Sequence, residues 1–334
     1  MKRLLLFISL SACTTSQATK DQTVDPADES NPLQDDSENN SSTDSADPDD
    51  ASDDGQEDTG SPDDTDDEDT ESLPAIHLPG PNTVISSTGT FETSEDCTLS
   101  YTRYAPSSSE AVGEAFIFHG FMRGQEQFSD LGTHLASWGV NSTTVKLCHS
   151  TIVDVDTVQN SRDAVEFARS LEVEKVVWIG QSNGGVSALI AGGVAPDITA
   201  GILGLDPVES FAGGGTEWAG EVTSPAAALF GIPDDCNSDN SGRAPFSAAA
   251  GSIALRVSEA DHCSFEFPTN GLCQLACERD KPTFSDAQLT RTILELSTAW
   301  TLARLDPTFD ADPWWSVTGS QYSNLISTGA ISPL

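Results

Sequence analysis

The sequence predicts an α/β protein in which a mostly parallel sheet carries helices on both faces. From about residue 84 onward, short apolar runs alternate with amphipathic helical patterns, an order typical of parallel strands joined by helices. The runs 114–118 and 175–179 are mostly apolar, as buried strands are. Directly after the second run, Gly180-Gln181-Ser182-Asn183-Gly184 leads into a pattern of small residues that indicates a helix.

The expected elements follow one another in this order. Residues 84–91 and 98–104 alternate between apolar and polar and predict an edge pair of strands. Further strands are expected at 114–118, 141–147, 175–179, 200–205, 226–232 and 252–257, and helices at 128–138, 158–171, 183–191 and 285–304. The last helix begins with the capping box Ser285-Asp286-Ala287-Gln288. No internal repeat and no second folded domain is predicted.

The amino terminus predicts export. Two cations, Lys2 and Arg3, precede an apolar run at 4–10 that is too short to span a bilayer. Leu10-Ser11-Ala12-Cys13 resembles a bacterial lipobox, which implies that residues 1–12 are a signal peptide and that Cys13 is lipidated. The alternative is cleavage by the ordinary signal peptidase. Because Thr14 rather than Asp follows, the resemblance implies anchoring at the outer membrane or the cell surface, with the membrane as a partner through Cys13.

A strongly acidic segment separates this signal from the predicted domain. Residues 14–76 contain 22 Asp or Glu and one Lys, with almost nothing apolar. Such a segment cannot bury enough surface to offset its ordering entropy, so 13–76 is expected to be a disordered tether and 77–334 the folded domain. That domain, with 31 acids and 12 bases, is itself acidic. Since phosphate binding needs a basic face, no nucleic-acid partner is expected.

The cysteines indicate disulfides. Without Cys13, six remain: Cys97, Cys148, Cys236, Cys263, Cys273 and Cys277. An even number in an exported domain favours disulfides, and six cysteines allow fifteen pairings between which the sequence does not choose. No cysteine and histidine spacing is typical of a zinc site, and no metal or cofactor is expected.

Gly180-Gln181-Ser182-Asn183-Gly184 is typical of a nucleophile elbow, a tight strand-to-helix turn that exposes a serine. The residues two before and two after Ser182 must lack bulk in such a turn, which explains Gly180 and Gly184. Ser182 itself is expected in a strained backbone conformation that lifts its hydroxyl clear of the sheet. We therefore expect Ser182 to be a nucleophile.

A serine nucleophile needs a histidine base. Of five histidines, His262 follows the last predicted strand and comes after Ser182 in the chain, so we expect it to be the base. His77 and His134 are expected to be structural or exposed, and His149 to lie at a rim. His119 precedes Gly120 at a strand end, where its expected role is to shape the loop.

The histidine in turn needs an acid. Asp206 ends the strand that follows the elbow's helix, and Pro207 would stop that strand and fix the direction of the carboxylate. We favour Asp206. Asp234 and Asp235 follow the next predicted strand and remain alternatives.

An oxyanion hole requires two backbone N–H groups near the serine. The N–H of Asn183 and that of Phe121, in the loop after His119-Gly120, are the expected donors. Gly120 allows the backbone to turn close to a substrate.

Three segments together resemble the α/β-hydrolase family: His119-Gly120-Phe121, the stretch from Gly180 to Gly185, and Asp261-His262-Cys263. The resemblance covers about residues 80–305. Gly204-Leu205-Asp206-Pro207-Val208 resembles chlorophyllases and pancreatic-type lipases, and residues 128–139 resemble dienelactone-hydrolase-type and cutinase-like enzymes. Two features depart from the family. Gln181 stands where many relatives have His or Tyr, and many relatives carry the acid one strand later.

The resemblance implies a serine hydrolase that cleaves carboxylic esters, as a monomer, outside the cytoplasm. Only about twenty residues separate Asp206 from the next strand, so a small lid or none is expected, and a fairly open cleft. The alternatives are amide or thioester hydrolysis by the same residues, and a surface-binding lipoprotein of this fold without catalysis.

Overall fold

The computed structural model describes residues 73–334 except 108–109, 210–212 and 278–281. The predicted signal peptide 1–12, the lipidation site Cys13 and nearly all of the predicted tether therefore lie outside the described residues. The described chain begins at Leu73, and Ile76 is already fully buried in the core. The packed region thus includes the last residues of the segment expected to be a tether.

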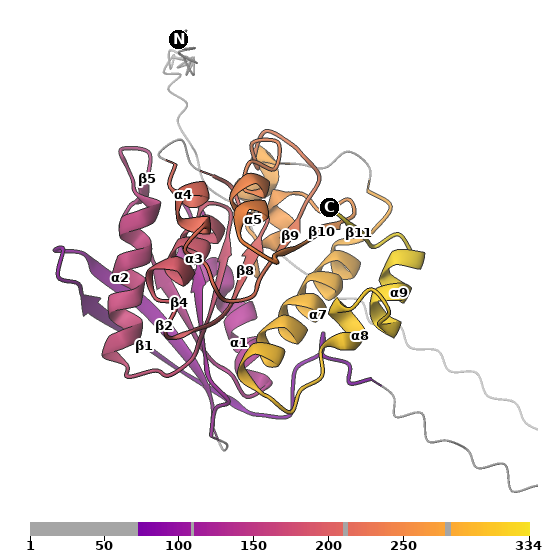
Figure 1. Cartoon of the computed structure of the whole chain (residues 1–334), viewed down its shortest axis with the longest axis horizontal. Coiled ribbons are helices and arrows are strands. Elements are labelled where there is room, and N and C mark those ends of the chain that lie inside the picture. The colour runs from indigo at the N-terminus through magenta and orange to yellow at the C-terminus, as the bar shows by residue number, and fades with distance from the viewer. Residues whose placement is uncertain (1–72, 108–109, 210–212, 278–281) are drawn as a thin grey trace, which may run out of the picture. The chain divides into compact units, whose positions relative to one another are not determined.

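A nine-stranded mixed sheet forms the centre of the described domain, in the order β1-β2-β4-β3-β7-β8-β9-β10-β11 (Figure 1). Its strands are β1 (Val84–Glu92), β2 (Thr98–Pro106), β3 (Glu114–Phe118), β4 (Asn141–Lys146), β7 (Val176–Gln181), β8 (Thr199–Leu205), β9 (Ala226–Phe230), β10 (Ile253–Val257) and β11 (Ile331–Pro333). All neighbours from β4 to β10 pair in parallel, whereas β1, β2 and β11 join antiparallel at the edges. A separate hairpin pairs β5 (Ser150–Thr151) with β6 (Asp154–Val155).

The described helices up to residue 248 connect the parallel strands, and those after residue 257 lie between β10 and the antiparallel strand β11. The helices are η1 (Gln125–Phe128), α1 (Ser129–Ser137), α2 (Thr157–Ser170), α3 (Asn183–Val194), α4 (Gly215–Ala219), α5 (Arg243–Ala248), η2 (His262–Phe265), α6 (Gly271–Ala276), α7 (Asp286–Leu305), α8 (Asp312–Trp315) and α9 (Ser320–Ser327). The capping box predicted at Ser285 is present, with Gln288 as its reciprocal partner.

Both faces of the sheet are covered, because alternate residues of each central strand enter different cores. In β7, Val177 and Ile179 belong to the core formed with α1 and α7, while Val176 and Trp178 belong to the core formed with α2 and α3. Figure 1 shows α2 and α3 on one side of the sheet and α7 on the other. The predicted α/β class, with a mostly parallel sheet covered on both faces, is therefore confirmed.

Several short elements were not expected from the sequence. Strand β11 adds an antiparallel edge to β10, and α8 and α9 precede it, so the packed structure continues to the end of the chain. Between β8 and β9 the chain forms α4, which packs on α3 and α5. Among the described residues, no helix is both long and apolar enough to cross a membrane.

Candidate active site

Ser182 lies at a sharp turn between β7 and α3. Its φ and ψ are 57° and −130°, a left-handed conformation that costs a non-glycine residue energy. The turn is held in place because the Ser182 N–H donates to the Leu205 carbonyl at 3.0 Å and the Ser182 carbonyl accepts from the N–H of Val208 at 2.9 Å. The local geometry is that expected for a nucleophile elbow.

The glycines around this turn are required by close backbone contacts. A Cβ on Gly180 would lie 2.1 Å from the Gly184 carbonyl oxygen, and a Cβ on Gly184 would lie 2.4 Å from that of His119. A Cβ on Gly120 would lie 2.8 Å from the Ser182 Cβ. The turn after β3 and the elbow after β7 therefore pack directly on each other, which brings the predicted oxyanion loop beside the serine.

His262 and Asp206 are in direct contact at the same edge of the sheet. His262 Nδ1 lies 2.7 Å from Asp206 Oδ2, and the Asp206 side chain is fully buried. Asp206 directly follows β8, and its backbone has a positive φ of 44°. His262 begins η2, whose N-cap Asp261 forms a capping box with Ser264. A residue after β8 and one after β10 thus meet across 56 positions of sequence.

Asp206 has two further partners that hold its carboxylate. The Gly231 N–H donates to Oδ1 at 2.9 Å, and the Asn237 side-chain amide donates to Oδ2 at 3.2 Å. Asn237 also donates to the Ile232 carbonyl at 2.6 Å, so its amide is fixed. Nothing in the sequence marks Asn237 as part of the site, because an asparagine in a loop between strands is ordinary.

The alternative acids lie elsewhere in this loop. Asp234 Oδ1 accepts from the Asn237 N–H at 2.9 Å and so stabilises the loop, while Asp235 is exposed. Among the described residues, Asp206 is the only one of the three carboxylates that is hydrogen-bonded to His262.

Nearby carboxylates raise the pKa of His262. Burial lowers its pKa and is the largest single influence, but the hydrogen bond and charge of Asp206, with the charges of Asp234 and Glu266, outweigh it and raise the pKa above 6.5. The pKa of Asp234 is itself raised, mainly by burial. His262 is therefore a stronger base than a free histidine.

His119 shapes the turn that carries Phe121. Its buried ring accepts from the Leu147 N–H through Nε2 at 2.9 Å, so Nδ1 carries the proton and donates to the Gly120 carbonyl at 2.7 Å. Burial lowers the pKa of His119 to about 4, which keeps the ring neutral. Met122 follows with a φ of 56°, and its N–H donates to the Ser150 carbonyl at 2.7 Å.

The two predicted oxyanion donors lie in the loop after β3 and at the start of α3. Asn183 is the first residue of α3, and the first N–H groups of a helix lack an intrahelical acceptor. Phe121 follows Gly120, and no backbone carbonyl among the described residues accepts from its N–H.

An ion pair joins the loop after β3, which contains Phe121, to the segment that contains His262. Arg123 forms a two-pronged contact with Glu266, which directly follows η2, and also donates to Asn270 at 3.2 Å. Both charges are largely withdrawn from solvent. Such bidentate pairs are strong and directional, so the relative positions of the two loops are fixed.

Gln181 makes a contact that the sequence did not indicate. This last residue of β7 places its side-chain Nε2 3.1 Å from Nε2 of His262 and 3.3 Å from the His262 carbonyl oxygen. The contact spans 81 residues and depends on one side-chain conformation, so no sequence signal could have revealed it.

Ser182 and His262 are mostly buried, with 7% and 8% of their surface exposed. Two cavities flank the site without including either residue. One, of about 530 Å³, is lined by Asp261, Ser264, Glu266 and Leu289 among others. The other, of about 400 Å³, lies beside the oxyanion turn at Met122, Leu147, Ser150 and Thr151.

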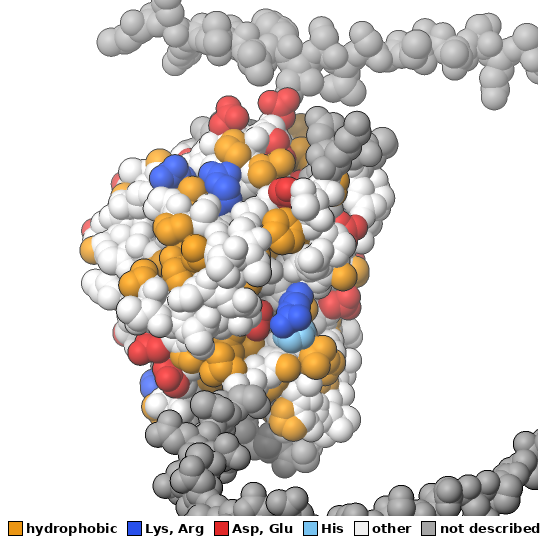
Figure 2. Space-filling model, turned by 90° about the vertical axis from the view of Figure 1, so that its right-hand side faces the viewer, with side chains coloured by type: hydrophobic (Ala, Val, Ile, Leu, Met, Phe, Trp, Pro, Cys, Tyr) orange, Lys and Arg blue, Asp and Glu red, His pale blue; other side chains and the backbone are white. Residues whose placement is uncertain are grey.

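Exposed apolar side chains lie near this second cavity. Met122 is 56% exposed, and Ile152 and Val153, at the tip of the β5–β6 hairpin, are 70% and 93% exposed. On the face shown in Figure 2, hydrophobic side chains occur in several groups, and few charged side chains lie among them.

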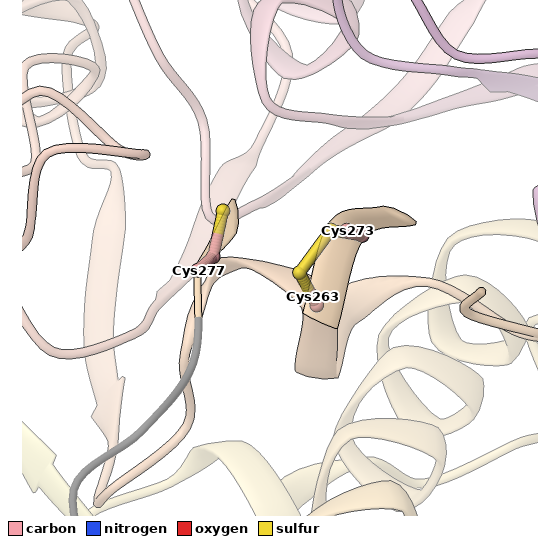
Figure 3. Close-up of side chains that lie close together, drawn as sticks. All are labelled: Cys263, Cys273 and Cys277. Atoms are coloured by element: carbon pink, nitrogen blue, oxygen red, sulfur yellow. A yellow bond between two sulfur atoms is a disulfide. The ribbon is translucent and has the colours of Figure 1, made fainter. Parts of the chain in front are cut away.

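Three disulfides are present, which confirms that prediction and selects one of the fifteen pairings. They join Cys97 to Cys148, Cys236 to Cys277, and Cys263 to Cys273. The sulfurs of Cys263, Cys273 and Cys277 lie within 4.8 Å of one another. Figure 3 shows these three side chains close together. All three are oxidised, so none supplies the thiolate that a metal ion would need.

The remaining histidines make contacts other than the one between His262 and Asp206. His134 Nε2 is 2.9 Å from the Ile76 carbonyl oxygen, and His77 Nδ1 is 4.0 Å from Glu295. His149 contacts Asp154 at 2.9 Å beside the Cys97–Cys148 disulfide.

Comparison of the chain with protein-family models and with curated proteins gives no match. The residues of the site are therefore the basis for any functional conclusion.

Proposed function

We propose that the protein is a serine hydrolase of the α/β-hydrolase fold that cleaves carboxylic esters. The observation that carries the proposal is the 2.7 Å contact of His262 Nδ1 with the buried Asp206 carboxylate, at the sheet edge where Ser182 has an elbow conformation. A carboxylate on Nδ1 keeps the proton on that nitrogen and leaves Nε2 as the base. This is what a serine hydroxyl requires for activation near neutral pH.

In the proposed reaction, Ser182 Oγ attacks the acyl carbon and His262 Nε2 takes the hydroxyl proton. The negative charge that develops on the acyl oxygen is stabilised by the N–H groups of Phe121 and Asn183. The tetrahedral intermediate collapses, and the leaving alcohol takes the proton from His262. Water then attacks the acyl-enzyme with His262 again as base, which releases the acid and restores Ser182.

The surroundings favour esters with an apolar part. The exposed side chains of Met122, Ile152 and Val153 and the 400 Å³ cavity lie beside the oxyanion turn, where one end of a substrate would project. The domain is acidic, which disfavours strongly anionic substrates.

Labelling and turnover together test the proposal. A fluorophosphonate probe is expected to label Ser182 of the wild-type protein, and a p-nitrophenyl ester to be hydrolysed. Ser182→Ala should abolish the label and lower the rate by about 10⁶-fold, because the nucleophile is lost. An unlabelled wild-type protein would indicate a binding module, and ester turnover by Ser182→Ala would disprove the assignment.

We also infer that the protein is exported and anchored by lipid on Cys13. The three disulfides support an oxidising compartment, since disulfides persist there and are rare in the cytosol. Growth with labelled palmitate should label the wild-type protein and leave Cys13→Ala unlabelled. Equal labelling of the two proteins, or none of either, would contradict the anchor.

A further inference from the structure

The Gln181 amide contacts the one nitrogen of His262 that the proposed reaction uses. The nitrogen in question is Nε2. Because Nδ1 is hydrogen-bonded to Asp206, Nδ1 carries the proton, and Nε2 presents a lone pair. The NH₂ group of Gln181 has two hydrogens, and two acceptors lie within its reach: Nε2 at 3.1 Å and the His262 carbonyl at 3.3 Å. The amide can therefore donate to the ring and to its backbone at once.

The other end of the same amide is confined. Oε1 of Gln181 is buried without a hydrogen-bond partner among the described residues, and the side chain is only 1% exposed. Oε1 lies against Gly120, where an added Cβ would be 2.5 Å from it. An unsatisfied buried acceptor is costly, so the two donated hydrogen bonds are what hold the side chain in this orientation.

We propose that Gln181 is a positioning residue that caps Nε2 of His262 in the resting protein and must leave that nitrogen before Ser182 can be activated. The claim that Gln181 must leave Nε2 before Ser182 is activated rests on the proposed function. The cap itself is a property of the resting protein, and it can be measured without a substrate.

The cap favours the neutral imidazole. A donor facing Nε2 stabilises the lone pair, whereas a protonated Nε2 would oppose one N–H to another. The charged groups that face His262 act in the opposite direction: Asp206 after β8, Asp234 after β9, and Glu266 after η2, the last paired with Arg123. In this proposal Gln181 acts, as burial does, against three carboxylates at this ring.

The first test is an NMR titration of His262 in the ligand-free full-length protein. Gln181→Met keeps the length and volume of the side chain but removes the donor. The acid dissociation constant of His262 is expected to fall about three- to tenfold, which is a rise in its pKa, because one hydrogen bond to the neutral form is lost. Gln181→Glu should raise the pKa further, since a carboxylate favours the imidazolium.

The second test is the rate at which a fluorophosphonate labels Ser182. In this reaction the Oγ–P bond forms, the P–F bond breaks and the serine proton passes to His262, so the rate reports whether Nε2 is accessible. At a pH above the titration of His262, Gln181→Met should label about three- to tenfold faster than the wild type. Gln125→Met, which removes a side-chain amide that lies in η1 and bonds Thr102, is the matched control and should change neither measurement.

The outcomes separate the two proposals. If the pKa of His262 is unchanged or lower in Gln181→Met, the cap is disproved, whatever the labelling rate. If the pKa rises but neither the wild-type protein nor Gln181→Met reacts with the probe, the cap stands and the hydrolase proposal fails. Should Gln181→Met fold poorly, Gln181→Asn provides the same test, because its amide is one methylene too short to reach Nε2.

Discussion

Two buried histidines at the same edge of the sheet, His119 and His262, have opposite charge preferences. His119 bonds only backbone groups, the Leu147 N–H and the Gly120 carbonyl, and burial lowers its pKa to about 4. His262 is 8% exposed, yet its pKa is raised, because Asp206 bonds it and two more carboxylates face it. Burial alone makes an imidazole inert, and a buried carboxylate partner makes it a base.

The two histidines also differ in role: His119 stabilises the structure of the site, whereas His262 has a chemical role in the proposed reaction. His119 fixes a turn by keeping one tautomer, so a change in its charge would break a backbone contact. His262 has to gain and lose a proton in the proposed reaction. Three substitutions test this comparison, and the largest effect is expected at the carboxylate.

Asp206→Asn should lower kcat for ester hydrolysis by about 10⁴-fold, because the imidazole loses its anionic partner and its preferred tautomer. The pKa of His262 should fall in the same variant. Both are measured by kinetics and by NMR titration, with the exposed Asp235→Asn as the matched control. Near-normal activity in Asp206→Asn, with loss in Asp234→Asn, would transfer the role of the acid to Asp234.

His119 should make the fold sensitive to acid. Its pKa is about 4 when folded and 6.5 when unfolded, so below pH 6.5 the unfolded chain binds a proton that the folded protein does not. Its stabilisation is complete above pH 6.5 and is lost as the pH falls towards 4, by about 2–3 kcal/mol between pH 7 and pH 4.5.

Urea unfolding at the two pH values measures this loss. His119→Asn, which cannot titrate, should be less stable at pH 7 but should lose about 2–3 kcal/mol less than the wild type on acidification. An identical pH dependence in the two proteins would show that His119 is not the group responsible.

Asp234→Asn is expected to have the smallest effect. Its charge raises the pKa of His262 less than Asp206 does, and no hydrogen bond joins the two side chains. The acid limb of the kcat/KM profile should move to lower pH by roughly half a unit, under 1 kcal/mol, with kcat within about threefold of wild type. A shift as large as that of Asp206→Asn would mean that the two carboxylates act equally on His262.

Much of this architecture could be predicted because it depends on short sequence patterns, in which neighbouring residues determine the local structure. Strands β3, β7 and β8 are short apolar runs, and α7 begins with a capping box. The elbow could be predicted from the spacing of Gly180 and Gly184, because a tight turn at Ser182 needs residues without side chains at these two positions. Chain order then brings residues after β8 and β10 to the same edge, which is why His262 and Asp206 could be named.

The features that were missed depend on tertiary packing. β11 has three residues and α8 has four, too few for any periodicity, and both are stabilised by contacts with β10 and α7. The disulfide pairing, the contact of Gln181 with His262 and that of Asn237 with Asp206 require coordinates, because each joins residues separated by at least ten positions.

The disulfides have a practical consequence for anyone who prepares this protein. Cys236 adjoins Asn237, the partner of Asp206, and Cys263 adjoins His262, and both cysteines are linked to the short segment from Cys273 to Cys277. Material produced in a reducing cytosol begins without these two links, and three sulfurs within 4.8 Å can exchange partners during later oxidation. Peptide mapping of the cysteine pairs should therefore precede any assay, so that a mispaired sample is not mistaken for a protein without the proposed activity.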